Sequence, residues 1–295
     1  MTAIRQEILT VARALDRAAR RLAGGGIEAS RLDARLLLAH ATGRDGLQFI
    51  TAPDRPLSPD EIGRFDVLIE RRLRREPVSH LTGVREFWSL PFSVSAEVLD
   101  PRPDSETLVE CALELFPDAA SELSVLDLGA GSGCLLLSVL HERPRARGIG
   151  VDLSAAALEI ARRNADRLGL AGRATFLRGD WAAGVDDAFN LILCNPPYVA
   201  TADIDRLAPE VALFDPRGAL DGGADGLDAY RAILPGLGRL LAPGGYALFE
   251  IGQGQAPDLS ALAEANGLVF SALRHDLSAI DRCAILRRSS VLTDT

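Results

Sequence analysis

The fold is decided by the stretch SVLDLGAGSG, residues 124–133. Its first five residues are mostly apolar and predict a buried strand. Three glycines follow in the pattern G-x-G-x-G, which lets the backbone of the loop pass close to a ligand. A helix is expected to begin at Leu135. This order of elements is typical of α/β folds that bind nucleotide-like cofactors, although dinucleotide-binding folds share the loop, which alone is a weak signal.

Strands and helices alternate from this stretch to the end of the chain. Further strands are predicted at residues 147–151, 174–177, 189–194, 246–251, 268–273 and 283–286. Further helices are predicted at residues 155–168, capped by Ser154, and at residues 227–241 and 255–266. Repeated β-α units predict an α/β fold with a mostly parallel, doubly wound, seven-stranded sheet, whose sites lie at the carboxyl ends of the strands.

The N-terminal part of the chain shows helical patterns and no chemical motif. Apolar spacing predicts a helix over residues 2–24 and a second helix that begins at Ser30, with Asp33 completing a capping box. Three leucines of the second helix are expected to face inward: Leu32, Leu36 and Leu37. A short element follows at residues 46–50, and residues 58–61, Ser-Pro-Asp-Glu, predict the capped start of another helix.

That last helix ends in an arginine cluster at residues 71–75, which is either a solvated helix end or a docking patch for a macromolecule. Aromatic residues alternate at residues 84–99 and predict a hairpin. Asp104 or Ser105, in the loop after the hairpin, can cap the helix that follows. This loop either joins two domains or covers an active site. We expect three parts: a helical domain at residues 1–83, a hairpin and linker at 84–103, and a catalytic domain at 104–295.

Acidic and aromatic residues follow the strands where a cofactor site would need them. Asp152 ends the second strand of the sheet, 19 residues after Gly133, where a carboxylate can accept hydrogen bonds from both ribose hydroxyls. Asp180 and Trp181 end the third strand and suit the amino group and the face of an adenine. The predicted cofactor-binding residues are Asp127, Gly129, Ala130, Gly131, Ser132, Gly133, Asp152, Asp180, Trp181 and Asn195. The loop and Asp152 fit either NAD or S-adenosylmethionine.

The fourth strand of the sheet ends in Asn195-Pro196-Pro197-Tyr198. Consecutive prolines stop the strand and contribute no N–H, so this corner is rich in hydrogen-bond acceptors. The Asn195 amide and the Pro196 carbonyl can hold a planar –NH2 group by both hydrogens, with Tyr198 on its flat face. We predict Asn195, Pro196 and Tyr198 as catalytic residues, and these three with Pro197 as the substrate site. In isolation, a motif of this kind is equally consistent with a proline-rich turn. Beside this glycine loop, it favours a methyl donor over NAD as the cofactor.

Composition and charge narrow the function further. No apolar run approaches a membrane span and the N-terminus lacks a secretory pattern, so we expect a cytoplasmic protein that binds no membrane. The four cysteines and four histidines are scattered, so we expect no metal. Residues 1–90 carry a net charge of +3 and residues 91–295 a net charge of −12. An acidic body is a poor match for phosphate backbones and argues against a nucleic-acid substrate. We expect a monomer.

Together these motifs resemble the class I S-adenosylmethionine-dependent methyltransferases that modify amino groups. Further stretches are similar to the bacterial peptide chain release factor glutamine N5-methyltransferase family, at residues 76–83, 85–88, 101–110, 215–227 and 249–252. The resemblance covers about residues 76–288, and the helical domain matches in kind. Ser105 departs from the family's usual threonine, and residues 277–282 lack its glycine before Asp281-Arg282.

This resemblance implies a Rossmann-like methyltransferase domain joined by a β-hairpin to a small all-α domain that recognises the substrate. It implies S-adenosyl-L-methionine as cofactor and S-adenosylhomocysteine as product. The implied substrate is the glutamine of the Gly-Gly-Gln motif in class 1 release factors, so that the enzyme supports translation termination. Carried over by position, residues 129–133, Asp152 and Trp181 hold the cofactor, and residues 195–198 hold the glutamine amide.

Two other functions stay open. The first is a DNA or RNA adenine-N6 methyltransferase, because N-P-P-Y can bind any planar amino group. Such an enzyme would need a basic surface around the site, which the acidic residues 91–295 do not offer. The second is a binding module without catalysis, in which the helical domain recruits a partner and the cofactor is structural.

Overall fold

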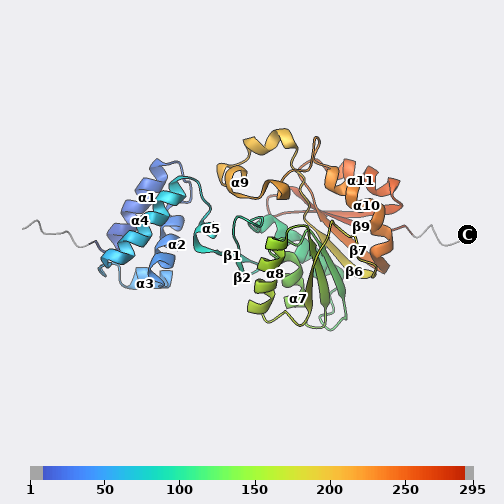
Figure 1. The fold of residues 1–295 in the computed structure, drawn as a ribbon, viewed down its shortest axis with the longest axis horizontal. Coiled ribbons are helices and arrows are strands. Elements are labelled where there is room, and N and C mark those ends of the chain that lie inside the picture. The colour runs from blue at the N-terminus through green and yellow to red at the C-terminus, as the bar shows by residue number, and fades with distance from the viewer. Residues whose placement is uncertain (1–8, 290–295) are drawn as a thin grey trace, which may run out of the picture. The chain divides into compact units, whose positions relative to one another are not determined.

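The structure is a computed structural model that describes residues 9–289. Its chain divides into two compact units. One unit comprises the described residues up to Gly83 together with Pro209–Phe214. The other comprises Val84–Ala208 and the described residues from Asp215 onward. Figure 1 labels many of the elements of both units.

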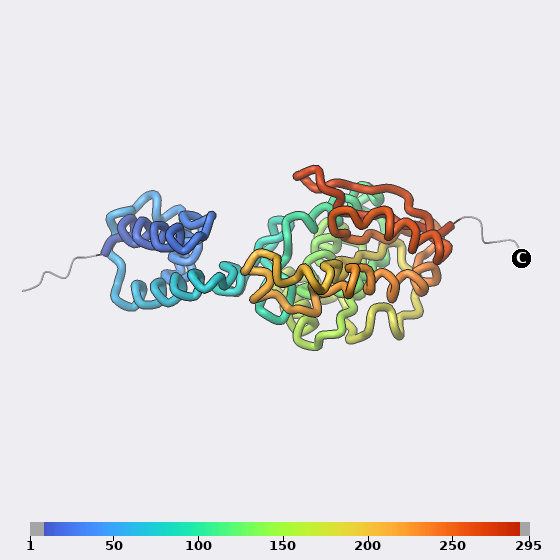
Figure 2. Tube along the Cα trace, turned by 90° about the horizontal axis from the view of Figure 1, so that it is seen from above, coloured from blue at the N-terminus to red at the C-terminus, as the bar shows by residue number. Residues whose placement is uncertain are grey.

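Helices make up the first unit, and it buries its own apolar core. They are α1 (Val11–Gly24), α2 (Ser30–Thr42), α3 (Gly46–Thr51), α4 (Pro59–Leu73), α5 (Val78–Thr82) and α9 (Pro209–Phe214). Figure 2 shows α1, α2 and α4 in blue and cyan as one bundle. Leu22, Leu37 and Phe65 are fully buried where these three helices meet. Helix α4 begins as predicted, with a capping box in which Glu61 N–H donates to Ser58 Oγ at 3.2 Å and Ser58 N–H donates to Glu61 Oε2 at 2.8 Å.

The capping box predicted for the second helix, Ser30 with Asp33, is wrong. Helix α2 begins after Ala29, so Ser30 already lies inside it and makes no cap hydrogen bond. Asp33 instead accepts a hydrogen bond from Arg72 Nε at 2.8 Å, and both side chains are buried. The buried stripe of α2 runs through Asp33, Leu37 and Ala41, one position along from the stripe that the leucines suggest.

That shift of the stripe overturns part of the predicted core. Leu37 faces inward as predicted, but Leu32 and Leu36 are exposed by 54% and 43%. The start of the first helix is also later than predicted. Helix α1 begins at Val11, and Thr10 pairs with Pro56 in an isolated bridge, while residues 2–8 of the prediction lie outside the described residues.

The arginine cluster forms ion pairs within the first unit. Arg71 contacts Glu76, and Arg72 lies 2.8 Å from Asp33 and 3.0 Å from Glu210 of α9. Arg75 lies 3.3 Å from the same Glu210 carboxylate oxygen, whereas Arg74 is exposed. Arg72 is thus buried and paired rather than solvated, whereas a docking role for the cluster stays a prediction.

The second unit is built on a seven-stranded sheet in the order β5-β4-β3-β6-β7-β9-β8. Its strands are β3 (Ser124–Leu128), β4 (Arg147–Asp152), β5 (Ala174–Arg178), β6 (Phe189–Cys194), β7 (Leu241–Glu250), β8 (Leu268–His275) and β9 (Asp281–Arg288). The first five strands of this order are parallel, and β9 is antiparallel to both of its neighbours. The predicted doubly wound sheet is therefore confirmed.

Helices cover both faces of this sheet, as Figure 1 shows. Helices α6 (Glu106–Leu115), α7 (Cys134–Glu142) and α8 (Ala155–Arg167) share one buried cluster with Val125 of β3. Helices α10 (Asp228–Leu240) and α11 (Ala256–Ala265) share the other with Leu126 and Leu128. Successive residues of one strand thus enter opposite layers. Because β4 and β6 lie on opposite sides of β3, the connections diverge there and open a crevice at the strand ends.

The predicted hairpin is present and short. Strands β1 (Val84–Phe87) and β2 (Leu90–Ser93) pair with Phe87 opposite Leu90. The two turn residues, Trp88 and Ser89, have φ of 53° and 56°, the left-handed values of a tight hairpin turn. Such values are strained for these residues, and two hydrogen bonds hold Trp88: its N–H donates to Glu106 at 2.7 Å and its indole N–H donates to Glu142 at 2.9 Å.

Two other predictions for the second unit differ from the structure. Strand β7 begins at Leu241 rather than at residue 246, with a register shift in its pairing to β6 that accommodates the Pro243-Gly244-Gly245 segment. The 3₁₀ helices η2 (Thr201–Arg206) and η3 (Arg217–Ala219) lie between β6 and α10, where we predicted no element. Such short helices have too few turns to show an apolar periodicity.

Candidate active site

The glycine loop after β3 is held by the end of the neighbouring strand. Gly129, Gly131 and Gly133 have φ of 76°, 53° and 79°, which side chains other than glycine rarely adopt. The N–H groups of Gly129 and Ala130 both donate to the Val151 carbonyl at 2.9 Å. The loop therefore turns back over β4 before α7 begins at Cys134.

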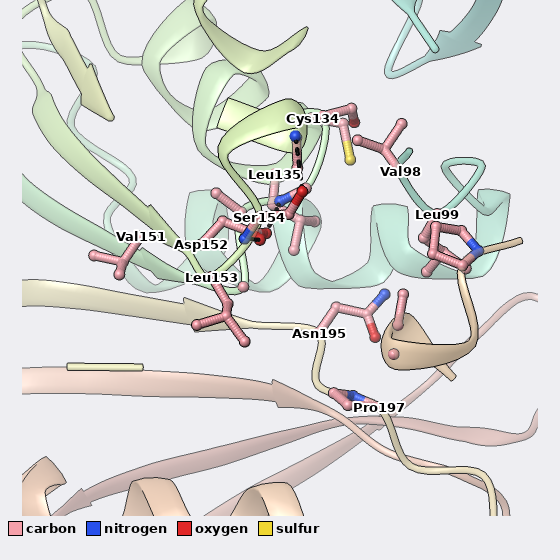
Figure 3. Close-up of a pocket in the computed structure, with 18 of the residues that line it drawn as sticks. Val98, Leu99, Cys134, Leu135, Val151, Asp152, Leu153, Ser154, Asn195 and Pro197 are labelled. Carbon is pink, nitrogen blue, oxygen red and sulfur yellow. Dashed lines mark hydrogen bonds between the residues drawn. The ribbon is translucent and has the colours of Figure 1, made fainter. Parts of the chain in front are cut away.

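A cavity of about 480 Å³ opens beside this loop, within the second unit. Many of the predicted site residues line this cavity, namely Gly129, Ala130, Gly131, Ser132, Asp152, Asp180, Trp181, Asn195 and Pro197. Figure 3 shows Asn195 and Pro197 on one side of the pocket and the segment from Val151 to Ser154 on another. Gly133, Asp127, Pro196 and Tyr198 do not line it. The structure thus brings the loop, the end of β4 and the end of β6 to one space.

Asp152 makes two backbone hydrogen bonds at the edge of the cavity. Its Oδ2 accepts the Gly131 N–H at 2.8 Å and its Oδ1 accepts the Ser154 N–H at 2.8 Å. The Ser154 hydroxyl in turn accepts from Ala157 N–H at 3.2 Å and caps α8, as predicted. One carboxylate therefore orders both the glycine loop and the turn that leads into α8. Each of its oxygens keeps a further lone pair for a ligand.

Asp127 lies beneath the loop rather than at the cavity. It is 1% exposed, and its Oδ2 accepts the Leu136 N–H at 3.3 Å, while Oδ1 has no hydrogen-bond partner among the described residues. Burial raises the pKa of Asp127 to about 7, and the nearby Asp152 adds to the rise. Its geometry makes it a support for the first turn of α7, and direct cofactor contact stays a prediction.

Trp181 stands beside the glycine loop. Its φ of 49° is a left-handed value for a bulky residue, and it packs close to Gly129, where an added Cβ would meet the ring at 3.4 Å. Asp180 lines the same wall. Contact of Asp180 and Trp181 with an adenine stays a prediction.

The residues of the N-P-P-Y motif follow β6 and reach into a buried polar network. Asn195 Nδ2 donates to Ser105 Oγ at 3.2 Å, and the Tyr198 hydroxyl donates to Glu250 Oε1 at 3.0 Å. Ser105 Oγ donates to Glu250 Oε2 at 2.5 Å. Burial raises the pKa of both the Glu250 carboxyl and the Tyr198 hydroxyl. The hydrogen bond to Glu250 therefore holds the ring of Tyr198, the last residue of the motif, in place.

Sequence reasoning missed Ser105 and Glu250 as site residues. Ser105 was a candidate helix cap, but it makes no cap hydrogen bond and lines the cavity instead. A signal for Glu250 exists: it ends β7, which pairs in parallel with β6 so that Cys194 lies opposite Phe249. The next residues, Asn195 and Glu250, therefore emerge side by side at the same sheet edge. The cavity is also lined by residues that we did not predict as site residues: Glu97, Val98, Leu99, Pro101, Arg102, Pro216, Gly218 and Ala219.

Two searches of the described residues give negative findings. Within residues 9–289, no group of three or more His, Cys, Asp and Glu side chains could hold a metal ion. No helix in this part of the chain has the length and apolar character needed to span a membrane.

Comparison with known proteins follows the same division of the chain. Residues 13–83 match the family described as PrmC N-terminal domain, and residues 87–217 match the family described as Methyltransferase small domain. Among solved structures, the hMettl16 catalytic domain in complex with a 3′UTR hairpin has a TM-score of 0.58 at 12% identity, covering 88% of this chain and 93% of that one. The Thermus thermophilus 16S rRNA N2 methyltransferase in complex with AdoMet and guanosine has a TM-score of 0.50 at 22% identity, covering 70% and 50%. These likenesses confirm the predicted Rossmann-like methyltransferase fold.

Relatives named Release factor glutamine methyltransferase align with nearly the whole chain. That of Rhodospirillum rubrum is 48% identical over 96% of this chain and 86% of its own length. Those of Caulobacter vibrioides and Bradyrhizobium diazoefficiens are each 45% identical, over 94% and 92% of this chain and 96% and 92% of their own lengths. At this identity over almost the full length, the chain belongs to the release factor glutamine methyltransferase family.

Proposed function

We propose that the protein transfers a methyl group from S-adenosyl-L-methionine to the side-chain amide nitrogen (N5) of a glutamine, leaving S-adenosylhomocysteine. The proposed glutamine is that of the Gly-Gly-Gln motif in class 1 peptide chain release factors, so that the reaction supports translation termination. One observation carries the proposal: Asn195 lines the same cavity as the glycine loop and Asp152. An acceptor for an amino group therefore stands where a methyl donor on the loop would end.

The residues around the cavity fit S-adenosylmethionine. Asp152 has lone pairs free for ribose hydroxyls, and Trp181 offers an aromatic face for the adenine. The backbone at Gly129 and Gly131 carries no Cβ that would keep a ligand away. We propose that the cofactor is held by Gly129, Ala130, Gly131, Ser132, Gly133, Asp152, Asp180, Trp181 and Asn195, with Asp127 supporting the loop from below.

The chemistry asked of the protein is to prepare a poor nucleophile. An amide nitrogen shares its lone pair with the carbonyl, and the ~18–20 kcal/mol barrier to amide rotation measures that conjugation. Asn195 Oδ1 and the Pro196 carbonyl would accept the two N–H bonds of the substrate amide, which keeps electron density on nitrogen and aims it at the cofactor. The bound cofactor supplies an electrophilic methyl group. Orienting two bound reactants can supply roughly 7–11 kcal/mol of the barrier.

We also propose that the helical part of the chain recognises the release factor, and that the enzyme acts as a cytoplasmic monomer. The match of residues 13–83 to a family of N-terminal domains supports a dedicated function for this part. The net charge of −12 over residues 91–295 argues for a protein substrate rather than a nucleic acid.

The test is transfer of a tritiated methyl group from S-adenosylmethionine to a purified class 1 release factor. The factor's own Gln→Ala variant and a DNA duplex serve as parallel acceptors. Label on the unaltered factor alone supports the proposal and locates the acceptor. Label on DNA would overturn the substrate while keeping the amino-group chemistry, and cofactor binding without label on any acceptor would point to a binding module.

A further inference from the structure

Three side chains from distant parts of the second unit form one line of hydrogen bonds. Asn195 Nδ2 donates to Ser105 Oγ at 3.2 Å, and Ser105 Oγ donates to Glu250 Oε2 at 2.5 Å. Ser105 is 2% exposed and Glu250 is 1% exposed, so water does not compete for the hydrogen bond between these two side chains. Asn195 itself extends into the cavity (Figure 3). The line therefore runs from a buried carboxylate to the wall of the proposed active site.

The direction of each hydrogen bond follows from the groups that make it. An ionised carboxylate can only accept, and a serine hydroxyl has one proton to donate. Because Glu250 takes the proton of Ser105, the lone pairs of Ser105 can only accept from Asn195. The –NH2 end of the Asn195 amide must then face Ser105. Its Oδ1 is left for the cavity.

This orientation decides whether Asn195 is an acceptor. With the amide reversed, Asn195 would present –NH2 to the –NH2 of a glutamine, and two donors would face each other without an acceptor. Asparagine amides are nearly symmetric in shape, so packing alone does not select one orientation. Only a neighbour of fixed donor or acceptor character can select it.

We infer that Ser105 and Glu250 are positioning residues that fix the Asn195 amide with its oxygen toward the substrate nitrogen. The inference rests on the proposed function and deepens it. Glu250 acts through Ser105, which is a contact of Asn195 and not of the reacting atoms. The second oxygen of Glu250 holds the Tyr198 hydroxyl at 3.0 Å, so one carboxylate orders both ends of the N-P-P-Y motif.

Three groups around Glu250 favour its ionised, hydrogen-bond-accepting form. Burial raises the pKa of Glu250, whereas hydrogen bonds from Ser105 and Tyr198 and the charge of Arg282 oppose the rise. Asp104 acts in the same direction as burial. Three favourable partners thus surround one buried carboxylate, in line with the rule that buried charges are paired and hydrogen-bonded.

The first test compares three serine variants in methyl transfer to a release factor. Ser105→Ala removes the acceptor for the Asn195 amide, so we expect kcat to fall about 10- to 100-fold, with the Kd of S-adenosylmethionine within about threefold. Ser105→Thr keeps the hydroxyl and should restore most of kcat. Ser138→Ala is the matched control, since Ser138 of α7 is also buried but its hydroxyl has no hydrogen-bond partner among the described residues. An unchanged kcat in Ser105→Ala, or no rescue by threonine, would overturn the inference.

The second test asks whether Ser105 and Glu250 act together. Glu250→Gln replaces an acceptor-only group by an amide that can donate a hydrogen bond to Ser105. This change can reverse the direction of the hydrogen bonds from Glu250 to Asn195. Residues that act as one unit are strongly non-additive, so Ser105→Ala with Glu250→Gln should be no slower than the slower single variant. Losses that multiply in the double variant would show two independent effects and contradict a shared role.

The third test needs no substrate and separates this inference from the proposed function. In the ¹⁵N-labelled protein, the side-chain –NH2 of Asn195 should exchange hydrogen slowly, and about tenfold faster or more in Ser105→Ala. Equal exchange in both proteins overturns the inference even if the wild type methylates a release factor. Slow exchange that depends on Ser105, in a protein that methylates no release factor, would instead keep the hydrogen-bond line and overturn the proposed function.

Discussion

The carboxylate of Asp152 accepts a hydrogen bond from the Gly131 N–H at 2.8 Å, which links the end of β4 to the glycine loop after β3. The loop's shape thus depends on an acid outside the loop itself. Removing the carboxylate frees Gly131 and Ser154 together, because both bond to it.

We therefore expect Asp152→Ala to weaken the binding of S-adenosylmethionine by about tenfold or more, through a disordered loop and lost ribose contacts. Isothermal titration calorimetry measures the Kd directly. Asp166→Ala is the matched control, since it removes the same charge from an exposed position on α8. A Kd in Asp152→Ala equal to that of the control would remove Asp152 from the proposed cofactor site.

A second prediction separates binding from transfer. Asn195→Ala should lose methyl transfer by about 100-fold or more, since no side-chain acceptor remains for the substrate amide, while the Kd of S-adenosylmethionine rises by no more than about threefold, because the proposed cofactor contacts of the glycine loop, Asp152 and Trp181 remain. Single-turnover transfer and calorimetry give the two quantities. Asn266→Ala, at the end of α11, is the control for an asparagine outside the cavity. Wild-type turnover by Asn195→Ala would rule out the proposed function of the motif.

The third prediction concerns Asp127 and pH. Its pKa is about 7 in the folded protein, above the ordinary 3.8 that the unfolded chain has. The folded state therefore holds a proton that the unfolded state releases, so the contribution of Asp127 to stability is fully present below about pH 4 and is lost as the pH rises to about 7. Asp127→Asn cannot ionise and should escape this loss.

Between roughly pH 5.5 and 7.5, we expect the free energy of unfolding of Asp127→Asn to increase by about 2 kcal/mol relative to that of the wild type, since one pKa unit corresponds to about 1.4 kcal/mol. Urea titrations at a series of pH values measure the difference. Parallel pH profiles for the two proteins would show that Asp127 keeps its charge when buried.

The fourth prediction concerns the buried ion pair of the helical unit. Arg72→Ala would leave Asp33 buried without its 2.8 Å partner and should destabilise the unit by about 3–5 kcal/mol. Arg74→Ala, on the exposed side of the same cluster, should change stability by less than about 0.5 kcal/mol. Loss of helical circular dichroism in urea reports both. Equal midpoints for the two variants would mean that Arg72 contributes no more than a surface charge.

Local patterns predicted what local interactions build. The cap at Ser58 and the cap at Ser154 each depend on residues a few positions apart, and each is present. The strands of the parallel sheet were predictable because their side chains are apolar on both faces. The glycine loop and the residues after β4 and β6 were predictable as a set because carboxyl ends of parallel strands converge.

Long-range contacts account for what was missed. Ser105 looks like a helix cap from its neighbours alone, but its proton goes to Glu250, 145 positions along the chain. Asp33 looks like the third residue of a capping box, but its carboxylate pairs with Arg72, 39 positions away. In both cases a short polar side chain has a local and a distant partner available, and burial favours the distant one. The exposed Leu32 and Leu36 follow from the second case, because the pairing of Asp33 turns its own stripe of α2 inward.

Helix α9 has a consequence for anyone who wishes to express the two units separately. Its residues, Pro209–Phe214, group with the helices of the first unit although they lie between β6 and α10 in the chain. The polypeptide thus passes between the units three times rather than once. A truncation at Gly83 would deprive the Glu210 carboxylate of its two native counterions, Arg72 and Arg75. A recombinant catalytic fragment should therefore also replace residues 209–214 with a short neutral linker.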